Sequence, residues 1–227
     1  MDLLKHYSAL YKQASQDILT GKYFIDPDID STSDTRFGLT LLIRPPEQIN
    51  ESIQRFLSEL KTIEPAQYYY PNSDLHITVM SVISCYNGFS LASVSVQDYI
   101  QLIEKSLKEL SRFEISFKGV TASPAAIMIQ GFPGDDTLGK MRDNLRTDFK
   151  ISGLEQTIDK RYPIVTAHTT IARFRQQLTD SHNLINLLDT YRNYDFGKFT
   201  VDEAELVYND WYQRAEMVKQ LHRFRLR

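Results

Sequence analysis

The spacing of apolar and polar side chains along the chain predicts alternating helices and strands. Apolar residues recur at helical spacing in five stretches, several of them bounded by Gly or Pro. The expected helices cover residues 2–20 and 181–191 and include the apolar positions of 49–60, 99–110 and 138–149. Short apolar runs between turn residues predict strands at 37–43, 75–83, 113–120, 125–130, 164–174, 199–208 and 217–226.

The order of these elements predicts an α+β fold with largely antiparallel strands. Helices and strands are mixed, and their connections are too short for parallel crossovers throughout. Residues 75–80 and 167–172 also form a faint internal repeat, because each leads through a loop to a helix and then to a strand. We therefore expect two similar lobes that face each other.

Composition places the chain among ordinary globular proteins. Of 227 residues, 42% are hydrophobic and 24% are charged, and 26 basic against 29 acidic side chains give a net charge of −3. This balance argues against a protein that coats long nucleic acids, and it leaves a short or small phosphorylated ligand open. A single cysteine, Cys85, excludes an intramolecular disulfide and a multi-cysteine metal site.

No apolar run approaches the roughly 20 residues that span a bilayer. The first residues also lack the basic flank and apolar stretch of a signal peptide. We therefore expect a cytoplasmic protein without a membrane partner. We also expect it to be a monomer.

Two of the five histidines occur in the same local setting, His-x-Thr within an apolar strand. The two copies are His76-Ile77-Thr78 and His168-Thr169-Thr170. Residues i and i+2 of a strand point to the same face, about 6.5–7 Å apart. Each strand is therefore expected to present an imidazole beside a hydroxyl, while the intervening residues face the core.

Two such strands facing each other would surround one small cavity with two imidazoles and two hydroxyls. A neutral imidazole can take a proton from water, and a protonated one can donate a proton to a departing alkoxide. The threonine hydroxyls can donate hydrogen bonds to the non-bridging oxygens of a phosphate ester. This scheme needs no metal and no other cofactor. A metal site is the other interpretation of two histidines, but it lacks a third ligand at fixed spacing, and threonine is a poor zinc ligand.

The paired motifs resemble those of the two-histidine phosphoesterase superfamily, which includes RNA ligase-like proteins and cyclic nucleotide phosphodiesterases. The signature of that family is two copies of His, apolar, Ser/Thr, apolar. The first copy matches throughout, whereas Thr169 in the second stands where an apolar residue is usual. The resemblance implies a bilobal α+β fold with two mainly antiparallel sheets, one motif strand on each beside a central cleft, and helices outside. Residues 36–227 fit it as a single two-lobed domain, and residues 1–35, a helix and an acidic loop, are then an N-terminal extension.

The resemblance also implies an activity. It points to a hydrolase that cleaves a 2′,3′-cyclic, 1″,2″-cyclic or related phosphodiester at an RNA end or in a small nucleotide, with His76, Thr78, His168 and Thr170 as catalytic residues. Which histidine is the acid and which is the base stays open. Two alternatives also stay open, namely a nucleotide- or RNA-end-binding protein without turnover and an RNA-ligating phosphoryl transfer in the same cleft.

Two tyrosines are further candidates for binding the substrate. Tyr162 and Tyr70 each share strand parity with the histidine that follows, and an aromatic ring can stack on a base. Packing in the core or in a loop is the alternative for both. Arg173 would suit a phosphate, but its odd spacing from His168 places it on the opposite face unless the strand bulges, so we do not include it.

Overall fold

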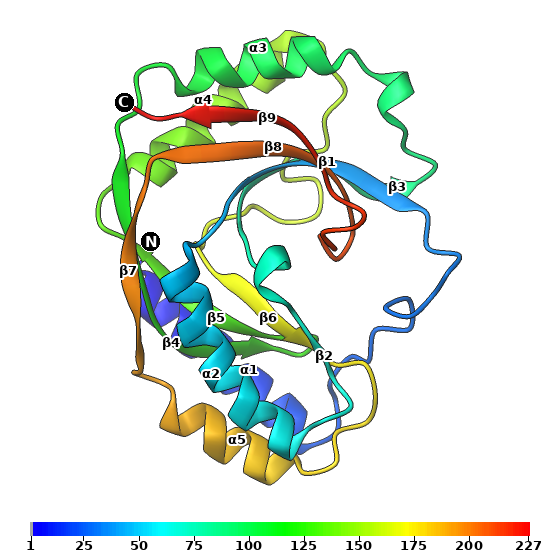
Figure 1. Ribbon diagram of the computed structural model, residues 1–227, viewed down its shortest axis with the longest axis vertical. Helices are drawn as coiled ribbons and strands as arrows, with labels where there is room; N and C mark the ends of the chain where they lie inside the picture. The colour runs from blue at the N-terminus through cyan, green and yellow to red at the C-terminus, as the bar shows by residue number, and fades with distance from the viewer. Residues whose placement is uncertain (1) are drawn as a thin grey trace.

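Residues 2–227, which the computed structural model describes, form one curled antiparallel sheet with helices along its outer side (Figure 1). The strands are β1 (Arg36–Ile43), β2 (Tyr68–Tyr69), β3 (Ile77–Asn87), β4 (Phe113–Ser123), β5 (Ala126–Pro133), β6 (Thr169–Arg173), β7 (Asp195–Val201), β8 (Glu203–Asp210) and β9 (Lys219–Arg225). They lie in the order β7-β4-β5-β6-β3-β1-β8-β9, and β2 pairs separately with β6.

The helices divide into two groups, one for each half of the sheet. They are α1 (Leu3–Leu19), α2 (Glu47–Ile63), α3 (Val96–Leu107), α4 (Thr137–Ser152) and α5 (Ser181–Thr190), with short 3-10 turns η1 (Asn72–Asp74) and η2 (Leu91–Ser93). In Figure 1, α3 and α4 cover the half formed by β3, β1, β8 and β9, and α1, α2 and α5 lie on the half formed by β6, β5, β4 and β7. One buried apolar cluster extends through both halves.

The expected α+β fold with two lobes and largely antiparallel strands is confirmed. The two sheets expected from the sequence are the two halves of one continuous sheet. They join where β3 meets β6, and the pairing there consists of a single pair, Ile77 opposite Thr169. This junction lies between the two His-x-Thr motifs, so the fold positions both motifs at the same place.

Two predicted strands differ from the structure, and one observed strand is not predicted. The strand expected at 164–174 is ordered as a strand only over Thr169–Arg173, because the residues before it bond to side chains instead of to a neighbouring strand. The strand expected at 199–208 is interrupted at Asp202, where the chain passes from β7, paired with β4, to β8, paired with β1. The two-residue strand β2 was not predicted, since it is too short to show an alternating pattern.

Helix α1 packs firmly on the half of the sheet that contains β4 and β5. Asp2 caps the helix by accepting a hydrogen bond from the Lys5 amide, and one face of the helix is buried. On that face the Tyr7 hydroxyl lies 3.2 Å from the Gly131 carbonyl oxygen, and Thr121 donates to the Tyr7 carbonyl. Of the predicted extension 1–35, residues 2–35 are described here, and its separation from the shared core stays a prediction.

Gly131 on β5 lies against the backbone of Ala167, directly before the second histidine. A Cβ added at Gly131 would overlap the Ala167 carbonyl oxygen, and the backbone would have to move to relieve the clash. We expect Gly131→Ala to lower the free energy of unfolding by about 1–3 kcal/mol, measured as a lower urea midpoint with an unchanged slope.

Gly139→Ala is the matched control. Gly139 lies inside α4, and no heavy atom lies within 4 Å of an added Cβ. This change should stabilise the protein by about 0.5–1 kcal/mol, because alanine favours a helix interior over glycine. Equal stability of Gly131→Ala and the unchanged protein would contradict the close approach of β5 to Ala167.

Candidate active site

The two His-x-Thr motifs lie side by side in the sheet. His76 immediately precedes β3 and His168 immediately precedes β6, and the single pair between these strands sets an antiparallel register. One further step along this register places His76 opposite Thr170 and Thr78 opposite His168. Because neighbouring side chains of a strand alternate, all four lie on one face. The structure therefore brings together the four residues expected to be catalytic.

Burial follows the same alternation. The four motif side chains are half-buried, and the residues beside them are buried in the core: Ile77, Val79, Thr169 and Ile171. Thr169 is fully buried, and within residues 2–227 its hydroxyl has no hydrogen-bond partner. The residue that departs from the usual motif thus faces away from the four candidates.

His76 is held by a backbone carbonyl. Its Nδ1 lies 2.7 Å from the Asp74 carbonyl oxygen. Because a carbonyl only accepts, Nδ1 carries the proton, and Nε2 of the neutral ring keeps a free lone pair. Burial lowers the pKa of His76 to about 4, and the charges of Arg44 and Arg173 lower it as well, against the hydrogen bond to Asp74.

His168 is held by a side chain instead. Its Nδ1 lies 2.6 Å from the Thr166 hydroxyl oxygen, and since a hydroxyl can donate or accept, either state of the ring fits. Burial lowers the pKa of His168 to about 4, and positive charge at His76, Arg142 and Arg173 lowers it further. The two rings are therefore close enough for protonation of one to disfavour protonation of the other.

Arg173 lies near both histidines, which corrects the expectation that it points to the opposite face. The register between β5 and β6 shifts by one residue at Ile171, so β6 contains a β-bulge. The extra residue reverses the strand parity beyond it and turns Arg173 toward the motifs. Its charge lowers the pKa of both histidines. The residue pattern of a five-residue apolar strand does not reveal a bulge, so the sequence alone could not predict which face Arg173 occupies.

The two candidate tyrosines lie in different surroundings. Tyr70 is only 2% exposed, and its hydroxyl accepts a 2.9 Å hydrogen bond from Nε of Arg173. Its ring thus offers no open face to a base, and it holds the arginine instead. Tyr162 is 66% exposed in the irregular segment before β6, where strand parity does not relate it to His168. A contact between Tyr162 and a substrate stays a prediction.

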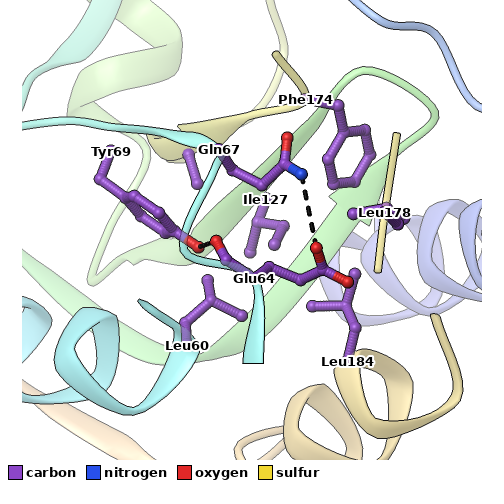
Figure 2. Close-up of a pocket in the computed structure, with 9 residues that line it drawn as sticks. Leu60, Glu64, Gln67, Tyr69, Ile127, Phe174, Leu178 and Leu184 are labelled. Carbon is purple, nitrogen blue, oxygen red and sulfur yellow. Dashed lines mark hydrogen bonds between the residues drawn. The ribbon is translucent and has the colours of Figure 1, made fainter. Parts of the chain in front are cut away.

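One hollow behind β6 is a packed junction and not a binding site. Figure 2 shows Glu64 within it, and the space leaves no room for a water molecule. The Glu64 carboxylate accepts hydrogen bonds from the Thr179 and Asp180 amides at 3.0 and 2.7 Å. The Gln67 side chain donates a third hydrogen bond, at 3.4 Å. These bonds tie the end of α2 to the loop that precedes α5.

A second hollow, of about 240 Å³, is lined in part by Arg44 and Glu205, which form an ion pair at 3.1 Å. Neither hollow is lined by a motif histidine. Among residues 2–227, no three His, Cys, Asp or Glu side chains gather as a metal-binding group. In the same range, no helix combines the length and the apolar character needed to cross a bilayer.

Comparison with known proteins identifies the family and the fold. A sequence model described as the 2′-5′ RNA ligase superfamily matches residues 45–212, which contain both motifs. This match confirms the resemblance to the two-histidine phosphoesterases. No curated protein matches the chain by sequence.

Solved structures share the fold at low sequence identity. E. coli LigT in complex with 3′-AMP has a TM-score of 0.60 at 17% identity, covering 84% of this chain and 98% of LigT. A protein of Thermus thermophilus has a TM-score of 0.58 at 16% identity, with coverage of 84% and 98%. A conserved Agrobacterium tumefaciens protein of unknown function has a TM-score of 0.57 at 16% identity, with coverage of 91% and 96%.

Both imidazoles should titrate well below the ordinary histidine pKa of about 6.5 in the folded protein, because burial disfavours their charged forms. NMR of the ring Cε1–H signals against pH measures the two midpoints. Inorganic phosphate, as a bound anion, should raise the pKa of both histidines. His76→Gln should raise the pKa of His168, because it removes a neighbouring positive charge. Midpoints at or above about 6.5 in the free protein would contradict these surroundings.

Proposed function

The chain belongs to the 2′-5′ RNA ligase superfamily, and we propose that it is a metal-independent phosphodiesterase that opens a cyclic phosphate. The substrate is a 2′,3′-cyclic or related phosphate at an RNA end or in a small nucleotide. The observation that supports this most directly is the pair of imidazoles and the pair of hydroxyls on one face of the sheet, aligned by the register of β3 and β6.

Hydrolysis divides the acid and base roles between the two histidines. His76 donates from Nδ1 to a carbonyl, so its Nε2 is free to take a proton from water. The water oxygen bonds to phosphorus, and the bond from phosphorus to one ribose oxygen breaks. His168 gives its proton to that oxygen, and its Thr166 partner accommodates the ring both before and after the transfer. A bound phosphate anion raises the pKa of His168 and so favours the protonated acid.

The remaining groups stabilise the negative charge on the phosphoryl oxygens. Thr78 and Thr170 each stand beside a histidine with a hydroxyl to donate, and Arg173 adds a cation held by Tyr70. E. coli LigT has been solved with 3′-AMP, with ATP and with phosphate. Small phosphorylated nucleotides are therefore the ligand class to test first on this chain.

Turnover should require both histidines and no metal. Purified protein in EDTA is incubated with the four 2′,3′-cyclic mononucleotides and with a short RNA that ends in a cyclic phosphate, and the products are separated by chromatography. His76→Ala or His168→Ala should lower kcat at least about 100-fold. Thr78→Val or Thr170→Val should lower it about 10-fold, the effect of one lost hydrogen bond to a charged oxygen.

Thr169→Val is the control on the same strand. Thr169 faces the core with an unpartnered hydroxyl, so this variant should keep the activity and gain about 1 kcal/mol of stability. Ligand binding without turnover would favour the binding-protein alternative, and joined RNA ends would favour ligation. Near-normal rates in both histidine variants would refute the two-histidine mechanism.

Arg173→Met should raise KM about 10-fold or more, because a hydrogen bond from a charged donor contributes about 1.5–3 kcal/mol. Arg175→Met is the matched control, since Arg175 forms a surface ion pair with Asp30. The control should leave KM within about twofold of the unchanged protein. Equal KM values for both variants would remove Arg173 from the substrate site.

A further inference from the structure

Arg142 reaches the two motif segments from behind. It lies on α4 and is only 4% exposed. Its Nε donates to the Val79 carbonyl oxygen at 3.0 Å, and its Nη2 donates to the carbonyl oxygens of Thr78 at 3.0 Å and Thr166 at 2.7 Å. One guanidinium group therefore binds the backbone of the first motif and the backbone that leads into the second.

These carbonyls lie where the sheet lacks its usual hydrogen bonds. The β3–β6 pairing consists of one pair, and the next residues along the register, Thr78 and His168, form no further pair. A buried backbone carbonyl without a partner is costly, so each strand needs another donor at this point. The planar guanidinium has five N–H donors in a fixed fork, which suits acceptors on two diverging strands.

The three hydrogen bonds of Arg142 all go to backbone carbonyls and none to a carboxylate. Burying a cation without an acidic partner carries a large desolvation cost, which packing alone does not justify. An apolar side chain would pack α4 against β3, but it would leave three carbonyls unbonded. The hydrogen bonds to both motif segments therefore explain why an arginine occupies position 142.

We propose that Arg142 is a positioning residue that sets the separation and orientation of the two histidine motifs. It acts on the first motif through the carbonyls of Thr78 and Val79. It acts on the second through Thr166, whose hydroxyl holds Nδ1 of His168. The proposal rests on the two-histidine hydrolysis proposed above for its catalytic consequence, while the coupling between Arg142 and His168 is a property of the free protein.

The charge of Arg142 has an effect that is separate from its geometry. Burial lowers the pKa of Arg142 to about 10, so the group stays protonated near neutral pH. The charges that lower the pKa of His168 come from His76, Arg142, Arg173 and, on α1, His6, while Tyr7 of α1 bonds to the Thr166 side chain beside it. Loss of the Arg142 charge alone should therefore raise the pKa of His168.

Two variants separate the geometry from the charge. Arg142→Lys keeps the charge but loses the fork, so kcat for the cyclic phosphate should fall at least about 10-fold with KM within about threefold, and the pH profile should stay in place. Arg142→Gln should lower kcat as well and should also move the limb that reports His168 to higher pH. Arg146→Lys, on the same helix, is the control and should keep kcat within about twofold, since Arg146 bonds mainly to Asp143 and Asp159.

Circular dichroism and thermal melting curves show which variants are folded, and only folded variants are assayed. A folded Arg142→Lys with normal kcat overturns the proposal and leaves Arg142 a purely structural role. The unchanged protein gives an independent readout, which also holds if a variant fails to fold. Its Arg142 Nη2–H resonances should follow the titration of His168, because Nη2 donates to the carbonyl of Thr166, whose hydroxyl bonds to His168.

An Arg142 resonance that stays fixed across that titration overturns the proposal whatever the variants do. This NMR measurement involves no substrate. Absence of turnover by the unchanged protein would therefore count against the proposed function, whereas a fixed Arg142 resonance would count against the positioning role.

Discussion

The pair Ile77 and Thr169 is the only pairing of β3 with β6 within residues 2–227, and the two strands form no further pair on either side of it. A full ladder would hold the motif strands about 4.8 Å apart, with opposing side chains in contact and no space for a phosphate. With no bridge, the register of the two histidines would be undefined. One pair sets the register and lets the strands diverge, and Arg142 supplies the hydrogen bonds that the divergence removes.

The positive charges around this junction favour an anionic ligand, although the chain as a whole is slightly acidic. Arg142 binds three backbone carbonyl groups and Arg173 binds a phenol, so neither charge is cancelled by a hydrogen-bonded acid. Of the buried acids, Glu64 binds amides beside α5 and Asp74 binds the Ala215 amide, while the charge of Asp26 acts on Arg173 without a hydrogen bond to it. Neutral, desolvated imidazoles among cations form a site whose own protonation is unfavourable. An entering phosphate anion reverses that preference, so substrate binding and acid activation are linked.

The sequence was most informative where a feature repeats and least informative where the backbone departs from regularity. The two His-x-Thr motifs could be found because strand alternation relates His76 to Thr78 and His168 to Thr170 by a spacing visible in the letters. The bulge at Ile171 breaks that alternation, so the regular spacing from His168, which places Arg173 on the opposite face unless the strand bulges, does not hold. Arg142 gave no signal at all, because its partners are backbone carbonyls, which every residue has.

Helix α1 shows why a boundary at residue 35 is difficult to place from sequence. The superfamily match begins at residue 45, yet Tyr7 is fully buried and its hydroxyl bonds to Gly131. Burial raises the pKa of Tyr7 to about 12, while the Gly131 backbone and the Thr166 side chain lower it. Thr166 also holds His168, so α1 contributes directly to the surroundings of the second histidine. A family member without this helix would need other groups at that position. The proton affinity of the second histidine is consequently a property of the individual chain, even where the motif itself is shared.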